Sequence, residues 1–291
     1  MRLSRTAKRI LPPIVIDAAR YLLRNGSHGE ASEMRPEWEY MPDGWHTKDP
    51  HIQGWNVQSV VAAQEKKWPK FLQLLQGPGT LGIAHEASMP TNDDFAAHNI
   101  LMSYGFVLAT AARKLDCVSL LDWGGGIGHY CAISKALVPE ATIKYHCHDL
   151  SLFCQCGREL LPEATFYDNE EECFKQTYDL VFASGSLHYA KDWRSLLARL
   201  ASVSRSYLFV TRLPITSKAP SFVMVQRPYR YGYHTEYLSW SLNRVEFLRY
   251  ARSLRLHLMR EFLVNPGQPH VVNAPEQPDY RGFLFRPDSQ G

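Results

Sequence analysis

Residues 121–128, Leu-Asp-Trp-Gly-Gly-Gly-Ile-Gly, decide the fold of this chain. They follow a mostly apolar run, 117–121, and precede a stretch, 129–138, with the composition of a helix. A strand that enters a helix through glycines lets the backbone approach a ligand closely and points unpaired helix N–H groups at it. The segment therefore predicts a strand, a glycine turn and a helix that together bind a nucleotide-like molecule.

The spacing of the glycines separates two classes of nucleotide site. The dinucleotide fingerprint G-x-G-x-x-G, counted from Gly124 and Gly126, needs a glycine where the chain has His129. An NAD-dependent oxidoreductase shares the fold and is the main alternative, but it would need that glycine. Counted from Asp122, the pattern is D-x-G-x-G-x-G and ends at Gly128. This pattern resembles motif I of the class I methyltransferases that use S-adenosylmethionine.

The resemblance implies S-adenosylmethionine as cofactor and S-adenosylhomocysteine as product. It places Asp122 opposite the positively charged amino-acid half of the cofactor. The four glycines of the turn would lie against the same molecule: Gly124, Gly125, Gly126 and Gly128.

A second acidic residue follows at the expected distance. Asp149 ends the predicted strand 141–147 and lies 21 residues after Gly128. An acidic residue about 20 positions beyond the turn can accept hydrogen bonds from both ribose hydroxyls. Asp149 is therefore predicted to bind the cofactor, with Leu150 beside it, although it could instead cap the next helix.

Further strands end in two more candidate cofactor residues. The stretch 164–167 ends at Asp168, and 178–183 ends at Ser184. The second resembles the fourth strand of the same family, whose following segment passes under the methyl group of the cofactor. Asp168 and Ser184 complete the predicted cofactor site.

The order of these segments predicts the fold class. Strands alternate with helical stretches such as 152–160 and 193–203, which indicates a parallel sheet with helices on both faces. Residues 258–264 and 282–285 are predicted to form a closing antiparallel pair. We expect an α/β, Rossmann-like sheet of seven strands, mostly parallel with the last strand antiparallel, and a ligand site at the carboxyl ends of the strands.

Length and composition set the domain organisation. The chain has 291 residues, of which 45% are hydrophobic, enough for one catalytic domain and an appended region. We predict a basic arm and linker (1–50), a helical lid (51–115) with helices over 57–76 and 95–114, and the catalytic domain (116–291). Asn92 or Asp93 is expected to cap the second helix.

Charge and cysteine content limit the partners and the compartment. A net charge of +3 does not indicate a nucleic-acid partner. The six cysteines lie within 117–173 and suit reduced, packed thiols of a cytoplasmic enzyme. His146-Cys147-His148 and Cys154-x-Cys156 lie close together, but they lack the paired spacing of a zinc site. With no lysine and acid cluster of a catechol site either, we predict no metal.

The first 24 residues combine six basic side chains with a short apolar run, 10–16. This run is too short to span a bilayer, and no cleavage site of a secretion signal follows it. A basic arm of this kind could contact the inner face of a membrane peripherally. Docking to the rest of the chain, or formation of a homodimer, explains it equally well.

Acceptor and catalytic residues are sought among polar side chains outside the cofactor motifs. Arginines bind carboxylates or phosphates and tyrosines stack on flat groups, so acceptor binding is assigned to four residues: Arg212, Arg227, Tyr233 and His85. For 226–234, a solvated loop with packed tyrosines is the alternative. A base that titrates near neutrality is also needed for a hydroxyl acceptor. His188, after the fourth strand, is the first candidate, with His234 and His85 in reserve.

A wider resemblance covers residues 55–285. Besides the glycine turn, Val210-Thr-Arg-Leu-Pro214 and Gly282-Phe-Leu-Phe-Arg286 make the chain similar to uncharacterised methyltransferases encoded with bacterial surface-glycan or natural-product genes. The resemblance implies methyl transfer but names no acceptor. We predict O-methylation of a small-molecule or glycan hydroxyl, with N-methylation as an alternative. A catalytically silent module that binds S-adenosylmethionine would carry the same motifs.

Overall fold

The computed structural model describes residues 35–45, 49–85, 89–113 and 115–288. By its internal contacts the chain divides into two units, 1–36 and 37–291, and every element below belongs to the second. The predictions for the basic arm, 1–24, lie outside the described residues.

Seven strands form the predicted sheet, in the order β4-β3-β2-β5-β6-β10-β9. Neighbouring strands run parallel, except that β10 is antiparallel to both β6 and β9. The fold prediction, including the antiparallel last strand, is confirmed. The strands are β2 (Cys117–Trp123), β3 (Thr142–His148), β4 (Thr165–Tyr167), β5 (Tyr178–Ser184), β6 (Ser204–Thr216), β9 (Leu256–Asn265) and β10 (Asp279–Pro287).

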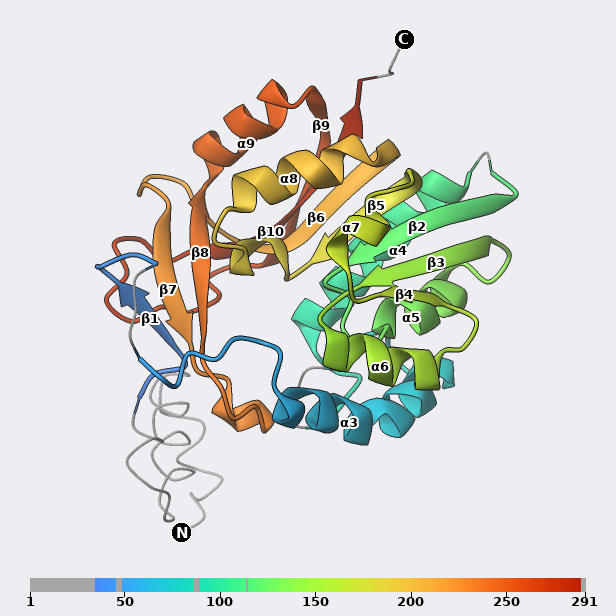
Figure 1. The fold of residues 1–291 in the computed structure, drawn as a ribbon, viewed down its shortest axis with the longest axis horizontal. Helices are drawn as coiled ribbons and strands as arrows, with labels where there is room; N and C mark the ends of the chain where they lie inside the picture. Colours follow the sequence, from blue (N-terminus) through green and yellow to red (C-terminus); the bar gives the residue numbers. More distant parts are fainter. Residues whose placement is uncertain (1–34, 46–48, 86–88, 114, 289–291) are drawn as a thin grey trace, which may run out of the picture. The chain divides into compact units, whose positions relative to one another are not determined.

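Three further strands extend the sheet to ten. They are β1 (Trp38–Met41), β7 (Phe222–Gln226) and β8 (Tyr237–Asn243). β7 pairs antiparallel with both β1 and β8, and β8 runs parallel to the last two residues of β6. Figure 1 shows them beyond the far end of β6. The interpretation of 25–50 as a linker is wrong at β1, because Trp38 is buried against Phe222 and Met224 of β7.

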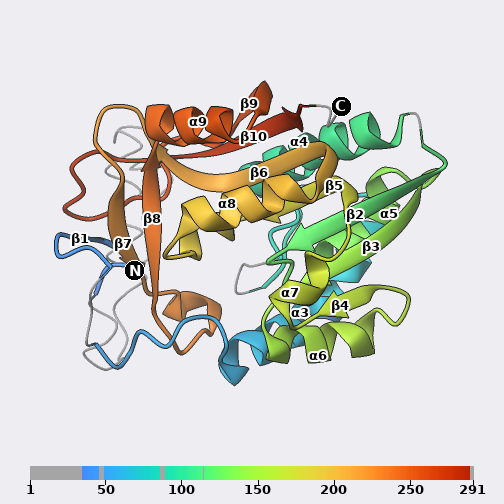
Figure 2. The same ribbon diagram turned by 45° about the horizontal axis from the view of Figure 1, so that its top comes forward.

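Helices cover both faces of the seven-stranded sheet (Figures 1 and 2). Side chains of α3, α4, α5 and α6 share one apolar core with the sheet, and those of α7, α8 and α9 share the other. On the first face lie α3 (Gln58–Gln76), α4 (Phe95–Ala112), α5 (His129–Leu137) and α6 (Ser151–Leu160). On the second lie α7 (Glu170–Cys173), α8 (Trp193–Ser202) and α9 (Arg244–Ser253).

Both helices predicted before the first parallel strand are present. α3 continues through Pro69, and α4 is capped by Asp94 rather than by Asn92 or Asp93, because the Asp94 carboxylate accepts from the N–H of Ala97. Within the described ranges, α4 is the one helix long and apolar enough to cross a membrane. Its inner side chains, among them Leu101, Tyr104 and Leu108, are fully buried in the core below the sheet.

Candidate active site

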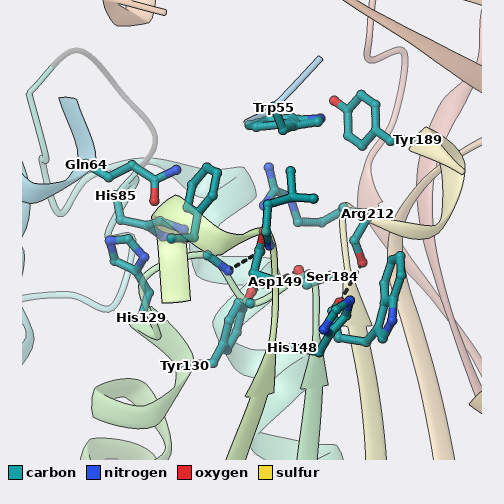
Figure 3. A pocket seen from close by; sticks show the side chains of 18 of the residues that line it. Trp55, Gln64, His85, His129, Tyr130, His148, Asp149, Ser184, Tyr189 and Arg212 are labelled. Atoms are coloured by element: carbon teal, nitrogen blue, oxygen red, sulfur yellow. Dashed lines mark hydrogen bonds between the residues drawn. The ribbon is translucent and has the colours of Figure 1, made fainter. Parts of the chain in front are cut away.

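A cavity of about 260 Å³ opens at the carboxyl ends of β2, β3, β5 and β6 (Figure 3). This is the edge at which parallel α/β sheets bind ligands. The cavity is lined by Trp55, Gln64, His85, Trp123, Gly124, Gly125, Gly126, His129, Tyr130, His148, Asp149, Leu150, Phe153, Ser184, Gly185, Ser186, Tyr189, Ala190 and Arg212.

The glycine turn forms the floor of this pocket. Gly124 and Gly126 have positive φ angles of 74° and 62°, which side-chain-bearing residues rarely adopt. A Cβ atom on Gly124 would lie 2.4 Å from Cβ of Ser186, and one on Gly125 would lie 2.5 Å from a carboxylate oxygen of Asp122. Gly124 and Gly125 therefore leave no room for a side chain, and the backbone of all three glycines lines the pocket.

Asp149 lines the pocket at the end of β3. Its two carboxylate oxygens accept from the N–H groups of Gly126 and Leu150, each at 2.7 Å. Burial raises the pKa of Asp149, although these two N–H donors act in the opposite direction. Each oxygen can accept a further bond. The arrangement fits a ribose diol held beside the glycine turn, with the exposed Leu150 next to it.

Asp122 does not line the pocket. It is fully buried beneath the turn, where the hydroxyl of Tyr145 donates to Oδ2, and Oδ1 has no partner among the described residues. Burial raises the pKa of Asp122 to about 7, against the opposing effect of the bond from Tyr145. Contact with the charged half of the cofactor is therefore not what this structure shows.

Gly128 is also a packing residue. It starts α5 with φ 93°, and a Cβ atom there would lie 2.6 Å from Leu161 and 2.9 Å from Phe166. The fourth glycine of the turn lets the helix begin close to its neighbours and is not among the lining residues.

The two remaining cofactor candidates differ in position. Ser184, the last residue of β5, lines the pocket and lies 3.1 Å from the hydroxyl of Tyr130. Asp168 is exposed after the short strand β4, where Arg158 pairs with it at 3.3 Å and lowers its pKa. Asp168 does not reach the pocket.

His188, the first candidate for the base, is buried and does not line the pocket. It lies in a 3-10 turn, Leu187–Tyr189, and its ring packs 4.2 Å from that of Tyr189. The turn brings Tyr189 to the pocket in its place, because consecutive residues of such a turn point in different directions.

His85 is the predicted histidine that the structure brings to the pocket. Its ring stacks 4.4 Å from that of His129, the first residue of α5, and packs 5.9 Å from Phe71 of α3. The pair lies at one side of the cavity, below Gln64 in Figure 3. Two imidazoles thus face the ligand space from the side of α3 and α5.

Arg212 lines the pocket from a bulge in β6. Phe283 of β10 pairs with Val210 and Arg281 pairs with Leu213, so that Gly282 alone opposes both Thr211 and Arg212. The backbone of Arg212 has a φ of 55°, a left-handed conformation that costs a non-glycine residue about 1–3 kcal/mol.

The other three acceptor or catalytic candidates lie outside the pocket. Arg227 is buried in ion pairs with Glu236 at 3.2 Å and Glu39 at 2.9 Å. Tyr233 is buried near α3, and His234 is exposed. Arg227 thus contacts the antiparallel strands and Tyr233 contacts Gln64 of α3, and neither of them lines the pocket.

Several lining residues were not predicted. Trp123, His148, Gly185 and Ser186 end strands or directly follow them, so the rule that ligands bind at carboxyl ends could have found them. Trp55 and Gln64 come from a segment far from every motif, and no pattern in the sequence marks them. Tyr189 follows β5, but so does its neighbour His188. Position after a strand therefore does not tell which of the two side chains lines the pocket.

The described residues include no group of three or more histidine, cysteine, aspartate or glutamate side chains placed to hold a metal ion. All six cysteines are free thiols, and five of them are buried.

The order of the seven strands, the glycine turn and the pocket above it define the class I S-adenosylmethionine-dependent methyltransferases. Residues 84–245, more than half of the chain, match the family model described as a methyltransferase domain, and the chain belongs to this family. This match excludes the alternative of an NAD-dependent oxidoreductase.

Solved structures of such enzymes are similar to the chain at low sequence identity. Magnesium protoporphyrin IX methyltransferase from Synechocystis PCC 6803, with S-adenosylhomocysteine bound, is 12% identical (76% of this chain, 93% of that chain, TM-score 0.45). An S-adenosylmethionine-dependent methyltransferase from Clostridium acetobutylicum ATCC 824 is 9% identical (65% and 92%, TM-score 0.43). An O-methyltransferase family protein from Burkholderia thailandensis is 12% identical (83% and 76%, TM-score 0.44). No curated protein matches the sequence.

Proposed function

We propose that this methyltransferase acts on a hydroxyl group of a small-molecule acceptor. The observation that supports this is His85 in the same pocket as Asp149 and the glycine turn. Bound S-adenosylmethionine supplies an electrophilic methyl group, and the acceptor oxygen forms a bond to its carbon as the carbon–sulfur bond breaks. The protein must align the hydroxyl with that carbon and take up its proton.

The residues that would hold the cofactor are Asp149 and the turn Gly124–Gly126. Calorimetry with S-adenosylmethionine, S-adenosylhomocysteine and NAD tests this site. We expect the first two to bind, NAD not to bind, and Asp149→Asn to weaken binding by about tenfold or more, since a charged hydrogen-bond acceptor is lost. An Asp168→Asn variant, altered outside the pocket, should match the wild type. Binding of NAD alone would contradict the proposal.

We assign the proton acceptor to His85. His85→Ala should lower turnover at least about tenfold, because general-base assistance is lost. Affinity for S-adenosylhomocysteine should stay within about threefold. Calorimetry measures the affinity, and the rate of S-adenosylhomocysteine release in the presence of an acceptor measures the turnover.

His234→Ala is the matched control for this substitution, since His234 is an exposed histidine outside the pocket. It should leave both values unchanged. An equal loss of cofactor affinity and turnover in His85→Ala would instead place His85 in the cofactor site.

A further inference from the structure

α3 carries a polar side chain in the middle of its core-facing stripe. The buried residues of this helix recur at the spacing of one helix face and are mostly apolar, and Gln64 is one of them. Gln64 is 7% exposed and lines the pocket. Figure 3 shows it beside the pocket, above His85. A leucine would fill this position with no unmet hydrogen bond, so packing alone does not explain the amide.

The two ends of the Gln64 amide are unequally used. Nε2 donates to the hydroxyl of Tyr233 in a long hydrogen bond of 3.5 Å. Oε1 is buried and accepts no hydrogen bond from any described residue. A buried acceptor with no donor destabilises the chain, so a ligand that donates to this oxygen would be bound more tightly for that reason.

The unpartnered oxygen of Gln64 lies against the glycine turn. A Cβ atom on Gly126 would lie 3.3 Å from it. The N–H of the same glycine donates to Asp149 at 2.7 Å, so Gln64 and Asp149 both adjoin Gly126. Each carboxylate oxygen of Asp149 can accept one further bond, which suffices for the two hydroxyls of a ribose. Gln64 is then left for a different donor of the cofactor.

The amino-acid half of S-adenosylmethionine ends in an ammonium group with three N–H donors. Asp122, which the sequence placed opposite this group, is buried beneath the turn and does not line the pocket. An amide oxygen accepts well from an ammonium group, and hydrogen bonds with one charged partner are stronger than those between neutral groups. Gln64 offers from α3 the acceptor that the end of β2 does not.

We propose that Oε1 of Gln64 accepts a hydrogen bond from the ammonium group of the bound cofactor. This inference rests on the proposed cofactor site and adds to it a residue from outside the glycine turn. α3 would thereby be joined to the turn through the cofactor. The adenine amine is the other donor of the cofactor that Asp149 leaves unassigned, and the test separates the two.

The test is calorimetry of the full chain with S-adenosylhomocysteine, its decarboxylated form and methylthioadenosine. The first two ligands keep the amino group, and the third lacks the whole amino-acid half. Gln64→Leu should weaken binding of the first two by about tenfold or more, as loss of a charged hydrogen bond predicts. Its affinity for methylthioadenosine should stay within about threefold of the wild type, which also shows that the variant is folded.

Two further variants support this test. Gln64→Met, which keeps the length of the side chain, should behave as Gln64→Leu does. Gln73→Leu is the matched control, because Gln73 lies on the same helix, is exposed and accepts from Lys70 at 3.0 Å outside the pocket. Its affinity for all three ligands should equal that of the wild type.

Three results would overturn the role of Gln64. One is wild-type affinity of both Gln64 variants for S-adenosylhomocysteine. Another is an equal loss with all three ligands, which would place Gln64 at the adenosine half. The third is a loss with S-adenosylhomocysteine but not with its decarboxylated form, which would make the amide a donor to the carboxylate. Failure of the wild type to bind S-adenosylhomocysteine would instead refute the cofactor site, so the two proposals fail separately.

Discussion

At the scale of single residues, Gly128 shows that a motif glycine can serve packing. Gly128→Ala should destabilise the chain through two effects. The left-handed backbone costs about 1–2 kcal/mol, and the clash with Leu161 and Phe166 adds about 1–3 kcal/mol of overpacking. Urea unfolding monitored by circular dichroism measures the loss.

Gly267→Ala separates the two effects. Gly267 has a φ of 70°, and no atom lies within 4 Å of a Cβ placed there. This control should show only the backbone cost of about 1–2 kcal/mol. Equal losses in both variants would mean that Gly128 has no packing role.

Asp122 predicts how stability depends on pH. Its pKa rises from 3.8 to about 7 on burial, so the folded chain keeps a proton that the unfolded chain releases. This contribution to the free energy of unfolding is fully present at low pH and is lost as the pH rises through about 7. Asp122→Asn should therefore reduce the fall in stability between about pH 4 and pH 7, measured by urea unfolding at several pH values.

Asp116→Asn is the control for this prediction. Asp116 is exposed and lies directly before β2. The free energy of unfolding of Asp116→Asn should therefore depend on pH as it does in the wild type. Identical slopes in Asp122→Asn and the wild type would show that Asp122 is ionised in the folded chain over this range.

The site shows at the same scale what the sequence can and cannot predict. The positions of Asp149 and Gly126 in the pocket were predictable, because they depend on local spacing along one βαβ unit. His188 is buried outside the pocket lining, since the direction of one side chain in a 3-10 turn is not encoded in a strand-end pattern. Trp55 was out of reach, because its position depends on packing against Tyr237, 182 residues later in the sequence.

At the scale of elements, the start of α4 provides a direct test. Asp94 accepts from the N–H of Ala97 at 2.7 Å, and its neighbour Asp93 does not cap the helix. Asp94→Ala should cost about 1 kcal/mol of stability, as loss of an N-cap does. Asp93→Ala should cost much less in the same urea unfolding experiment. A larger loss of stability in Asp93→Ala than in Asp94→Ala would show that Asp93 caps the helix, as the sequence predicted.

The elements differ in how far the sequence predicts them. β2, β3 and β5 are short segments bounded by turn signals, and both β9 and β10 were expected near their observed bounds. β1 was missed, because its four residues, Trp-Glu-Tyr-Met, lie among glycines, prolines and acidic residues and are too few to show a period of two. Their pairing with β7 is a long-range contact that only the folded chain reveals.

At the scale of the whole molecule, every lining residue of the pocket belongs to the unit 37–291. A chain that starts at residue 37 should therefore fold and bind S-adenosylhomocysteine within about threefold of the full-length affinity. Calorimetry and a thermal melt check both points. Loss of cofactor binding in the shortened chain would show that residues 1–36 contribute to the site. Contact of residues 1–24 with anionic membranes stays a prediction, which vesicle sedimentation of the two chains can test.

β6 joins the seven-stranded part of the sheet to the three antiparallel strands β1, β7 and β8. Ile215 and Thr216 lie beside Leu242 and Asn243, so the intervening stretch leaves and rejoins the sheet at adjacent positions. That stretch carries Tyr237, the support of Trp55, and none of the glycine turn. Replacement of this single continuous segment would therefore change the residue that supports Trp55 and would leave every residue of the glycine turn in place.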